Sequence, residues 1–417
     1  MSRFDPKAYT AVLAVKSAYR FDAGTFLMRM FMYTTTIGTI AMLTLAGASA
    51  FEAATISSAL ATCTFFVAPR VSRQIDKRGQ SAVVPWATVI GLLGFAMMIC
   101  VTQFGFPFWL NYPAAFLCSF LPNAPSIARA RWTYLVERRC LGKDTPTLKS
   151  VYAYEGILED IAFMAGPAAS IAIAAATVPV GGMAIGAVIF AVGTVLLMSS
   201  KDTEPDIDYL AEKARRAQEG EDRAAKRSAL LAYPMVSVLF AVMVLVGAIY
   251  GAFDNAAIAF AESVGIPILA SAVFAIESVF SLVVSTLFGM VHLSMPMRRQ
   301  FVVFAVLFGA MYALMVFIES PTSFIVIACI AAITYPLLLI TANVVCESAV
   351  PEAHLTEAMS WMNSGMSVGM VIGPVAAGAL IDAAGPLAGF DLSAGFAVLL
   401  VLVALATIPV VRKSFQR

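Results

Sequence analysis

The chain has 417 residues, of which 60% are hydrophobic and only 13% are charged, and its formal net charge is +1. With a mean hydropathy of +0.86, this composition excludes an ordinary soluble domain, and the near-zero charge gives no sign of nucleic-acid binding. A bilayer core is crossed by roughly 20 apolar residues of helix. The sequence predicts an all-α membrane protein with twelve such runs, which begin near residues 24, 51, 82, 107, 151, 180, 232, 267, 300, 322, 358 and 389.

The positions of the 27 Lys and Arg residues indicate the orientation. All except Arg29 lie before the first run, in alternate loops, or after the last run, and the remaining loops carry none. Basic residues in short loops stay on the cytoplasmic side of a membrane. We therefore expect both termini to be cytoplasmic.

Arg29 lies inside the first predicted span. At 1.5 Å per residue it is roughly 10 Å from the cytoplasmic side, and Glu155 enters its own span at a similar depth. The two side chains could pair, and two interpretations stay open. Arg29 and Glu155 form a buried structural ion pair, or Arg29 regulates the proton affinity of a nearby carboxylate.

A short basic loop follows the second span at residues 69–81, with the sequence PRVSRQIDKRGQS. Such a loop is ordinary on the cytoplasmic side, but it also resembles the G-x-L-x-D-R-x-G-R-R signature of the major facilitator superfamily at Asp76, Lys77 and Gly79. Four positions depart from that pattern: Ser72, Gln74, Gln80 and Ser81. The resemblance implies a gating loop in which Asp76 helps to latch the two halves of the protein together.

The fourth span contains the sequence LPNAPS at residues 121–126. Pro122 and Pro125 should distort this helix and free main-chain carbonyl groups near Asn123. Broken helices of this kind often line binding sites, so Asn123 is a candidate cavity-lining residue, although a simple packing kink is an equal alternative.

The fifth span concentrates acidic residues. Glu155 and Glu159 are four residues apart and share a helix face, with Tyr152 one turn earlier and Asp160 offset by one position. Charges at membrane depth are costly and normally face a partner or a water-filled cavity. We therefore interpret these residues as part of a transport pathway, with Tyr152 lining it.

The Gly166-Pro167 pair lies further along the same span and is expected to break the helix. Together with Ala153 and Ala162, it resembles the antiporter signature G-x8-G-x3-G-P of the superfamily. That resemblance suggests export.

The second half of the chain repeats the first. Gly166-Pro167 aligns with Gly373-Pro374 at an offset of 207 residues, which fits two six-helix halves. We expect an N-terminal bundle at residues 1–200, a cytoplasmic linker at 201–231 and a C-terminal bundle at 232–417. The acids of the fifth span have no counterpart in the repeat, where Met and Ser residues stand, so we favour a functional role for them.

The second half contributes further candidates. Glu277 is expected near the midplane in the eighth span, as a pathway residue or a structural partner, and Asp254 near the outer end of the seventh, as a gate or boundary residue. By resemblance to the superfamily, the fifth and eighth spans would meet between the halves. Trp361 and Asn363 in the eleventh span offer an aromatic plate and an amide to a cavity, although helix packing also explains this methionine-rich stretch.

No motif for ATP binding, for a HExxH zinc site or for a GxSxG nucleophile occurs. We expect no enzyme, no cofactor and no metal. The whole chain resembles bacterial major facilitator proteins of the drug or small-metabolite efflux type. The resemblance implies a monomeric, multi-pass protein of the plasma (inner) membrane whose partners are a small-molecule substrate, protons and the lipid bilayer.

The function predicted from these features is proton-coupled efflux of small amphipathic or cationic compounds by alternating access. The coupling pathway would contain Arg29, Glu155, Glu159, Asp160, Glu277 and Asp254. A sugar or polar-metabolite transporter is the first alternative, and a non-transporting receptor or scaffold with the same fold is the second.

Overall fold

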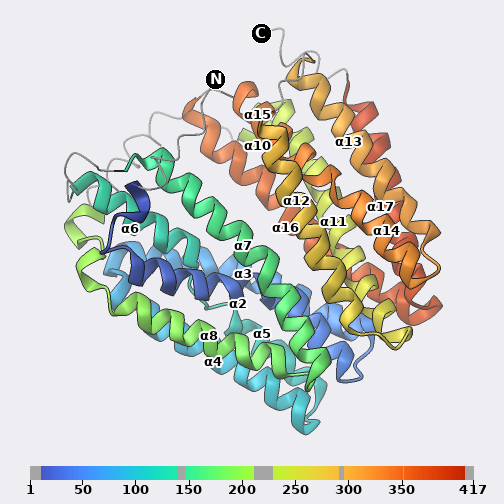
Figure 1. Ribbon diagram of the computed structural model, residues 1–417, viewed down its shortest axis with the longest axis horizontal. Helices are drawn as coiled ribbons and strands as arrows, with labels where there is room; N and C mark the ends of the chain where they lie inside the picture. The colour runs from blue at the N-terminus through green and yellow to red at the C-terminus, as the bar shows by residue number, and fades with distance from the viewer. Residues whose placement is uncertain (1–10, 139–145, 211–228, 291–294, 351, 409–417) are drawn as a thin grey trace. The chain divides into compact units, whose positions relative to one another are not determined.

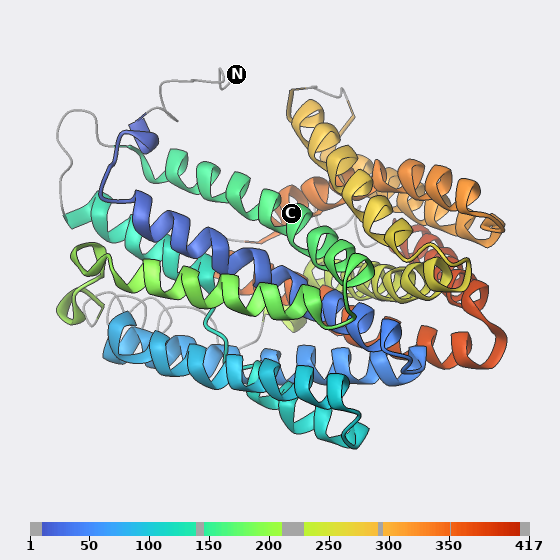
Figure 2. The ribbon, with the colours of Figure 1, turned by 60° about the horizontal axis from the view of Figure 1, so that its bottom comes forward.

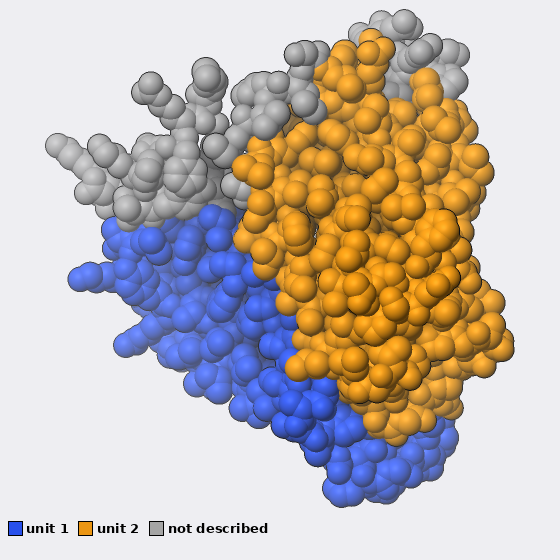
Figure 3. All heavy atoms as spheres, turned by 45° about the vertical axis from the view of Figure 1, so that its right-hand side comes forward, with its two compact units in different colours: residues 1–42, 62–217 blue, residues 43–61, 218–417 orange. Residues whose placement is uncertain are grey.

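The computed structural model describes residues 11–138, 146–210, 229–290, 295–350 and 352–408. Their regular structure is helical, and within these ranges no strand occurs (Figure 1). The chain divides into two compact units, shown in different colours in Figure 3. Unit 1 comprises residues 1–42 and 62–217, and unit 2 comprises residues 43–61 and 218–417.

The helices of unit 1 follow each other in an order set by the apolar runs of the sequence. They are α2 (Tyr19–Leu45), most of α3 (Ala50–Arg78), α4 (Gln80–Phe104), η1 (Phe108–Leu110), α5 (Asn111–Cys118), α6 (Ala124–Arg138), α7 (Leu148–Ala176), α8 (Gly181–Met198) and η3 (Lys201–Thr203). In Figures 1 and 2, α8 runs beside α2, and Gly24 of α2 lies against Gly193 of α8. Small residues permit this close approach of two membrane helices.

Unit 2 begins with residues 43–61, which contain the end of α2 and the first part of the long helix α3, so it shares both helices with unit 1. Its other helices are α10 (Ala229–Ala232), α11 (Pro234–Ser263), α12 (Ile268–Met290), α13 (Met297–Ala313), η4 (Leu314–Phe317), α14 (Pro321–Ala332), α15 (Thr334–Ala349), α16 (Glu352–Ala384) and α17 (Pro386–Ala406). Most residues of α11 are buried, because this helix packs along both α16 and α17. The rings of Phe253, Phe324 and Phe390 form its aromatic core, with centroids 5.5–6.1 Å apart.

Within the described ranges, ten helices are long and apolar enough to cross a membrane. The two other predicted spans correspond to the interrupted stretch from η1 to α6 and to α12, whose apolar part covers Ile268–Val284. The predicted all-α, multi-pass fold is therefore confirmed. The chain ends themselves and residues 211–228 of the predicted linker lie outside the described residues.

Residues 43–61 belong to unit 2 because polar side chains bind the start of α3 there. The Asp382 carboxylate accepts hydrogen bonds from the main-chain N–H groups of Ala50 at 2.9 Å and Phe51 at 3.2 Å. The Asn255 amide donates to the carbonyl oxygen of Pro374 at 3.0 Å and to that of Ala50 at 3.4 Å. The bonds to Asp382 satisfy N–H groups that a helix start leaves without a partner inside the helix, and the Asn255 bonds link the carbonyl oxygens of α3 and α16.

Segment 201–210, predicted as the beginning of a solvated linker, packs against α6. The Tyr209 phenol donates to Glu137 at 2.9 Å, its ring packs on Tyr134 with centroids 5.2 Å apart, and Tyr134 bonds Asp206. Burial first, and then the bond to Glu137, raises the pKa of the Tyr209 phenol. Tyr209 therefore remains a protonated donor and fixes this segment on α6.

Candidate functional site

A buried charge cluster, consisting of Asp22, Arg29, Trp132 and Glu155, joins three helices of unit 1. Arg29 from α2 and Glu155 from α7 form an ion pair, and both side chains are fully buried. The Arg29 guanidinium also donates to the main-chain oxygen of Glu155 at 3.4 Å. The structure thus brings together the two residues that were predicted to lie at equal depth.

Trp132 from α6 completes this cluster. Its indole N–H points to two carboxylates at once, with Nε1 2.9 Å from Oδ1 of Asp22 and 3.1 Å from Oε1 of Glu155. Phe21 packs edge-on against the indole, with ring centroids 5.5 Å apart. Loss of the Arg29 guanidinium would leave the buried Glu155 carboxylate without its ion-pair partner, and loss of the Trp132 indole would leave Asp22 without its hydrogen-bond donor.

A second pair lies one helical turn along α7 and is half-exposed. Glu159 pairs with Arg129 of α6, and its other oxygen accepts a 2.6 Å hydrogen bond from the Tyr33 phenol of α2. The side chains of Arg129 and Glu159 are 47% and 30% exposed, respectively. Solvent therefore screens this pair, and its contribution to stability is about 0–1 kcal/mol.

The other predicted residues of the fifth span occupy the exposed side of α7. Asp160 is exposed and lies close enough to Glu159 for the two charges to repel. Tyr152 is also exposed, and its hydroxyl lies 3.0 Å from that of Thr133. Both residues can therefore contact solvent or a solute, which Glu155 cannot.

The interruption of the fourth span aligns α6 with these acids. α5 ends at Cys118 and α6 begins at Ala124, as the two prolines predicted. Asn123 starts the new helix, because its side-chain oxygen accepts a 3.0 Å hydrogen bond from the Ser126 N–H. In the structure its amide therefore serves the helix start.

Four residues of this region were not predicted: Asp22, Tyr33, Arg129 and Trp132. Arg129 and Trp132 follow the proline-containing stretch of the fourth span, are three residues apart and share a helix face. That spacing, matched to Glu155 and Glu159 on the neighbouring span, was the available signal. Asp22, at the edge of its apolar run, gave only the weak signal of an acid beside basic residues.

The Gly-Pro pairs do not end their helices. α7 continues through Gly166-Pro167, so the break predicted there is wrong, and α16 continues through Gly373-Pro374. The helix kinks predicted at both Gly-Pro pairs stay predictions. The glycines instead allow contact between main chains. A Cβ atom on Gly166 would lie 2.3 Å from the carbonyl oxygen of Met30, and one on Gly373 would lie 2.3 Å from that of Ala248.

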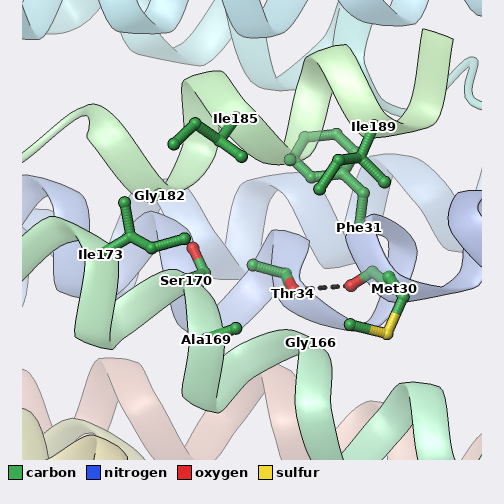
Figure 4. Close-up of a pocket in the computed structure, with 11 residues that line it drawn as sticks. Met30, Phe31, Thr34, Gly166, Ala169, Ser170, Ile173, Gly182, Ile185 and Ile189 are labelled. Atoms are coloured by element: carbon green, nitrogen blue, oxygen red, sulfur yellow. Dashed lines mark hydrogen bonds between the residues drawn. The ribbon is translucent and has the colours of Figure 1, made fainter. Parts of the chain in front are cut away.

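Figure 4 shows a cavity beside Gly166, between α2, α7 and α8. Apolar side chains, among them Phe31 and Ile185, and the hydroxyl groups of Thr34 and Ser170 line it. Its volume of about 40 Å³ suffices for a water molecule but is far below the roughly 300 Å³ of a small-ligand site. This cavity is therefore not a substrate site.

The acids of unit 2 occupy a different environment. Asp254 of α11 and Glu277 of α12 are close enough to interact electrostatically with each other and with the side chains of Tyr250 and Tyr312. The ring of Tyr250 packs against Tyr312 and Tyr335, with centroids 5.4 and 5.1 Å away. Oxygen Oε1 of Glu277 is buried without a hydrogen-bond partner.

The sequence around these two acids is poor in basic residues. No Lys or Arg occurs at residues 229–297 or 300–411, and Arg298 and Arg299 stand between these ranges at the start of α13. Among the described residues, Glu155 and Glu159 form ion pairs with guanidinium groups, whereas Asp254 and Glu277 form none. A bound proton would neutralise such a carboxylate, and a bound cation would balance its charge.

The predicted cavity-lining residues of α16, Trp361 and Asn363, lie in a different environment. The Trp361 indole donates to Glu357 at 3.3 Å and its ring packs on Phe240, whereas Asn363 is exposed. Within the described ranges, no group of three His, Cys, Asp or Glu side chains could hold a metal ion.

The predicted gating loop is shorter than its motif suggests. Asp76 and Lys77 lie in the last turn of α3, and Gly79 alone connects α3 to α4. Gly79 has φ +86°, a conformation that favours glycine. Glu204 binds the start of α4, accepting from the Ser81 N–H at 2.7 Å, so segment 201–210 also fixes this connection.

The arrangement of helices is that of the major facilitator fold, and comparisons with known proteins agree. The family model described as Major Facilitator Superfamily matches residues 293–416. No curated protein matches the sequence.

Solved transporters share the fold over almost the whole chain. A mutant of the nucleoside transporter NupG is 15% identical, with a TM-score of 0.70 over 94% of this chain and 100% of that one. A mutant of the peptide transporter POT is 13% identical, with a TM-score of 0.70 over 96% and 95% of the two chains. The POT family transporter PepTSo is also 13% identical, with a TM-score of 0.68 over 96% and 99%.

Proposed function

We propose that the protein is a secondary active transporter that exchanges protons for small amphipathic or cationic compounds and exports them. The observation that carries this proposal is the pair Asp254 and Glu277, two acids within membrane helices of a half in which, from residue 229 to residue 411, the sequence has Arg298 and Arg299 at the start of α13 as its only basic residues besides His. The major facilitator fold supports transport by alternating access.

The unbalanced acids supply a physical basis for exchange. An isolated carboxylate buried in a membrane protein costs several kcal/mol, so it takes up a proton or binds a cation. The two events compete, because each removes the charge that attracts the other. A cationic substrate that binds at Asp254 and Glu277 would therefore release protons, and protons arriving from the other side would release the substrate.

The aromatic surroundings favour an organic cation. The rings of Tyr250, Tyr312 and Tyr335 pack on one another, and Tyr250 and Tyr312 interact electrostatically with both acids. The face of an aromatic ring attracts a cation by about 0.5–2 kcal/mol. Ammonium groups with apolar substituents gain from both the rings and the carboxylates, whereas a neutral polar solute would leave the carboxylates without compensation.

In this proposal the halves at residues 1–200 and 232–417 rock about the substrate, joined by the linker at 201–231. The basic loops face the cytoplasm of a bacterial cell and both termini lie on that side. A monomer suffices, because each chain contains both halves. Glu159 and Arg129, which are half-exposed, form the proposed pathway in the first half.

A polar metabolite is the second candidate substrate. It is favoured by the similarity to structures named as nucleoside and peptide transporters, which extends over at least 94% of this chain. At 13–15% identity this similarity concerns the fold, so nucleosides and short peptides are comparison ligands in the test below.

The first experiment measures ligand binding to the purified full-length protein by its melting temperature. Lipophilic ammonium compounds, nucleosides, sugars and dipeptides are compared at an acidic and an alkaline pH. A ligand at a hundred times its Kd adds about 2.7 kcal/mol of stability. We expect stabilisation by ammonium compounds that increases at alkaline pH, where protons do not compete.

The second experiment places the protein in liposomes with a pH-sensitive dye inside. We expect the best ammonium ligand to drive proton movement, and Glu277→Gln to weaken its binding about 10- to 100-fold, because a hydrogen bond to a charged group contributes about 1.5–3 kcal/mol. Asp391→Asn, an exposed acid of α17, serves as the matched control. Stabilisation by a nucleoside or peptide alone, or proton movement that Glu277→Gln leaves unchanged, would overturn the proposal.

A further inference from the structure

Asp22 is a buried acid for which the proposed exchange has no role. It lies in the first turn of α2, its side chain is 7% exposed, and its carboxylate accepts the indole N–H of Trp132 at 2.9 Å. Among the described residues, no Lys or Arg lies within ion-pair distance of this carboxylate, since Arg29 pairs with Glu155 and Arg129 pairs with Glu159.

The charges around Asp22 do not balance. The buried cluster holds two carboxylates, Asp22 and Glu155, and one guanidinium group, Arg29, which already pairs with Glu155. If all three groups are ionised, one negative charge remains in a buried space. Such a charge costs several kcal/mol, and one bound proton removes it.

Asp22 and Glu155 compete for the indole N–H of Trp132, and their other partners decide which of the two acids binds the proton. Trp132 has a single donor, and carboxylate oxygens of Asp22 and Glu155 both lie within hydrogen-bond distance of it. Glu155 keeps an ionised partner in Arg29, which favours its charged form. A protonated Asp22 no longer needs the indole N–H, which then serves Glu155 alone.

The groups facing Asp22 come from each helix packed around it. Thr25 of α2 donates to its main-chain oxygen at 3.2 Å, and α8 approaches at Gly24 with Gly193 and Leu197, which carry no charge. The titratable and charged groups that act on its surroundings are Tyr19, Arg29, Arg129, Tyr154 and Glu155. Of these charged groups, Arg29 attracts the Asp22 carboxylate and Glu155 repels it.

We propose that Asp22 is a proton-binding site of the first half. A proton from water at the end of the bundle where α2 begins adds to one Asp22 oxygen and later returns to water, while the Arg29–Glu155 pair stays ionised throughout. This inference deepens the proposed function, because it adds a second proton site to the exchange, but its test requires neither a substrate nor a flux.

Release of this proton changes how α6 is held. With Asp22 ionised, two anions share the one N–H of Trp132, and their repulsion weakens the attachment of α6 to α2 and α7. The interruption at residues 119–123 separates α6 from α5, so α6 can shift as a short rigid element. Proton binding at Asp22 is thereby coupled to the position of the helix that carries Arg129.

Trp132 provides the readout. A reference chain in which Trp86, Trp109 and Trp361 are replaced by Phe retains Trp132 as its only tryptophan. The full-length reference protein is placed in lipid nanodiscs, and its tryptophan emission is measured from mildly acidic to mildly alkaline pH. We expect one transition, because the indole N–H exchanges a neutral neighbour for an ionised one.

Variants of the reference chain assign the transition. Asp22→Asn keeps an oxygen for the indole N–H but cannot titrate, so we expect the transition to be lost, whereas the exposed control Asp391→Asn should keep it. Asp22→Glu is a second variant that keeps a titratable carboxylate, so it controls for a loss of the transition caused by misfolding of Asp22→Asn. It should show the transition at a changed midpoint. The proposal is overturned if the reference shows no transition, if Asp22→Asn retains it, or if Asp22→Glu leaves its midpoint unchanged. Absence of transport in liposomes would instead count against the proposed exchange.

Discussion

Replacement of Arg29 by Met tests the energetic role of the buried ion pair. Met fills a similar volume without charge, so the Glu155 carboxylate would remain buried and lose its only salt-bridge partner among the described residues. Removal of one member of a buried pair costs about 3–5 kcal/mol. The Trp132 N–H still binds Glu155 in this variant, which places the expected loss near the lower limit, at about 3 kcal/mol.

The loss should depend on pH with a definite sign. At alkaline pH the unpaired carboxylate is charged, but acidification lets it take up a proton, and the remaining cost falls to that of an imperfectly bonded neutral group, about 1 kcal/mol. Denaturant unfolding of the detergent-solubilised protein, measured at alkaline and acidic pH, gives the free energy of unfolding for the variant and the parent. The difference between them should shrink as the pH falls.

Two comparisons make this prediction specific. Arg129→Met removes an arginine from the half-exposed pair with Glu159 and should cost at most about 1 kcal/mol. The double variant Arg29→Met with Glu155→Leu removes both buried charges and should lie within about 1 kcal/mol of the parent, because apolar replacements of buried pairs are often neutral. Equal losses for Arg29→Met and Arg129→Met, or a loss that does not change with pH, would refute the electrostatic explanation.

Three further predictions concern packing and helix starts. Gly373→Ala should destabilise the protein by about 1–3 kcal/mol in denaturant unfolding, since its Cβ would lie 2.3 Å from a main-chain oxygen of α11. Glu204→Ala should cost about 1 kcal/mol by removing the acceptor at the start of α4. Asp382→Ala should cost about 1–2 kcal/mol and speed amide hydrogen exchange at Ala50 and Phe51, whose N–H groups it binds.

Each of these has a control in the same unit or of the same chemistry. Gly395 has open space where a Cβ would be placed, so Gly395→Ala should leave the stability unchanged or raise it by about 0.5–1 kcal/mol. Asp391→Ala removes an exposed acid and should have little effect. Equal effects for Gly373→Ala and Gly395→Ala would argue against the close helix contact, and unchanged exchange at Ala50 in Asp382→Ala would argue against the capping role.

The helical framework could be predicted from sequence because bilayer thickness fixes the length of each apolar run. Depth along a span is equally simple arithmetic, which is why Arg29 and Glu155 could be matched. The interruption of the fourth span followed from Pro122 and Pro125, since each proline removes a donor and obstructs the helix.

The contacts of α6 could not be predicted in the same way. The position of a residue along its span gives its depth in the membrane, but it does not show which helices are in contact. In addition, an arginine near the cytoplasmic end of a span is usually explained by the preference of basic residues for that side. The contact of Asp22 with Trp132 could not be predicted either, because the sequence does not show which helices are in contact. Segment 201–210 looked like a solvated linker because its charges dominate the pattern, whereas two tyrosines dock it on α6. The break predicted at Gly166-Pro167 was wrong because the prediction considered only the local effect of proline. It did not consider the neighbouring helix α2, whose main chain lies so close that only glycine fits at position 166.

The two halves have equivalent glycines at a close helix contact, but their buried acidic residues are not equivalent. Gly166 lies against α2 and Gly373 lies against α11, so equivalent glycines permit the same close helix contact in both halves. The acidic residues take no part in this contact. The helix of the second half therefore packs without a counterpart of Glu155, and its own half carries unbalanced acids at Asp254 and Glu277 instead. A fold that needed buried charge for stability would be expected to repeat it; because only the packing repeats, the charges of each half are better explained by what they bind.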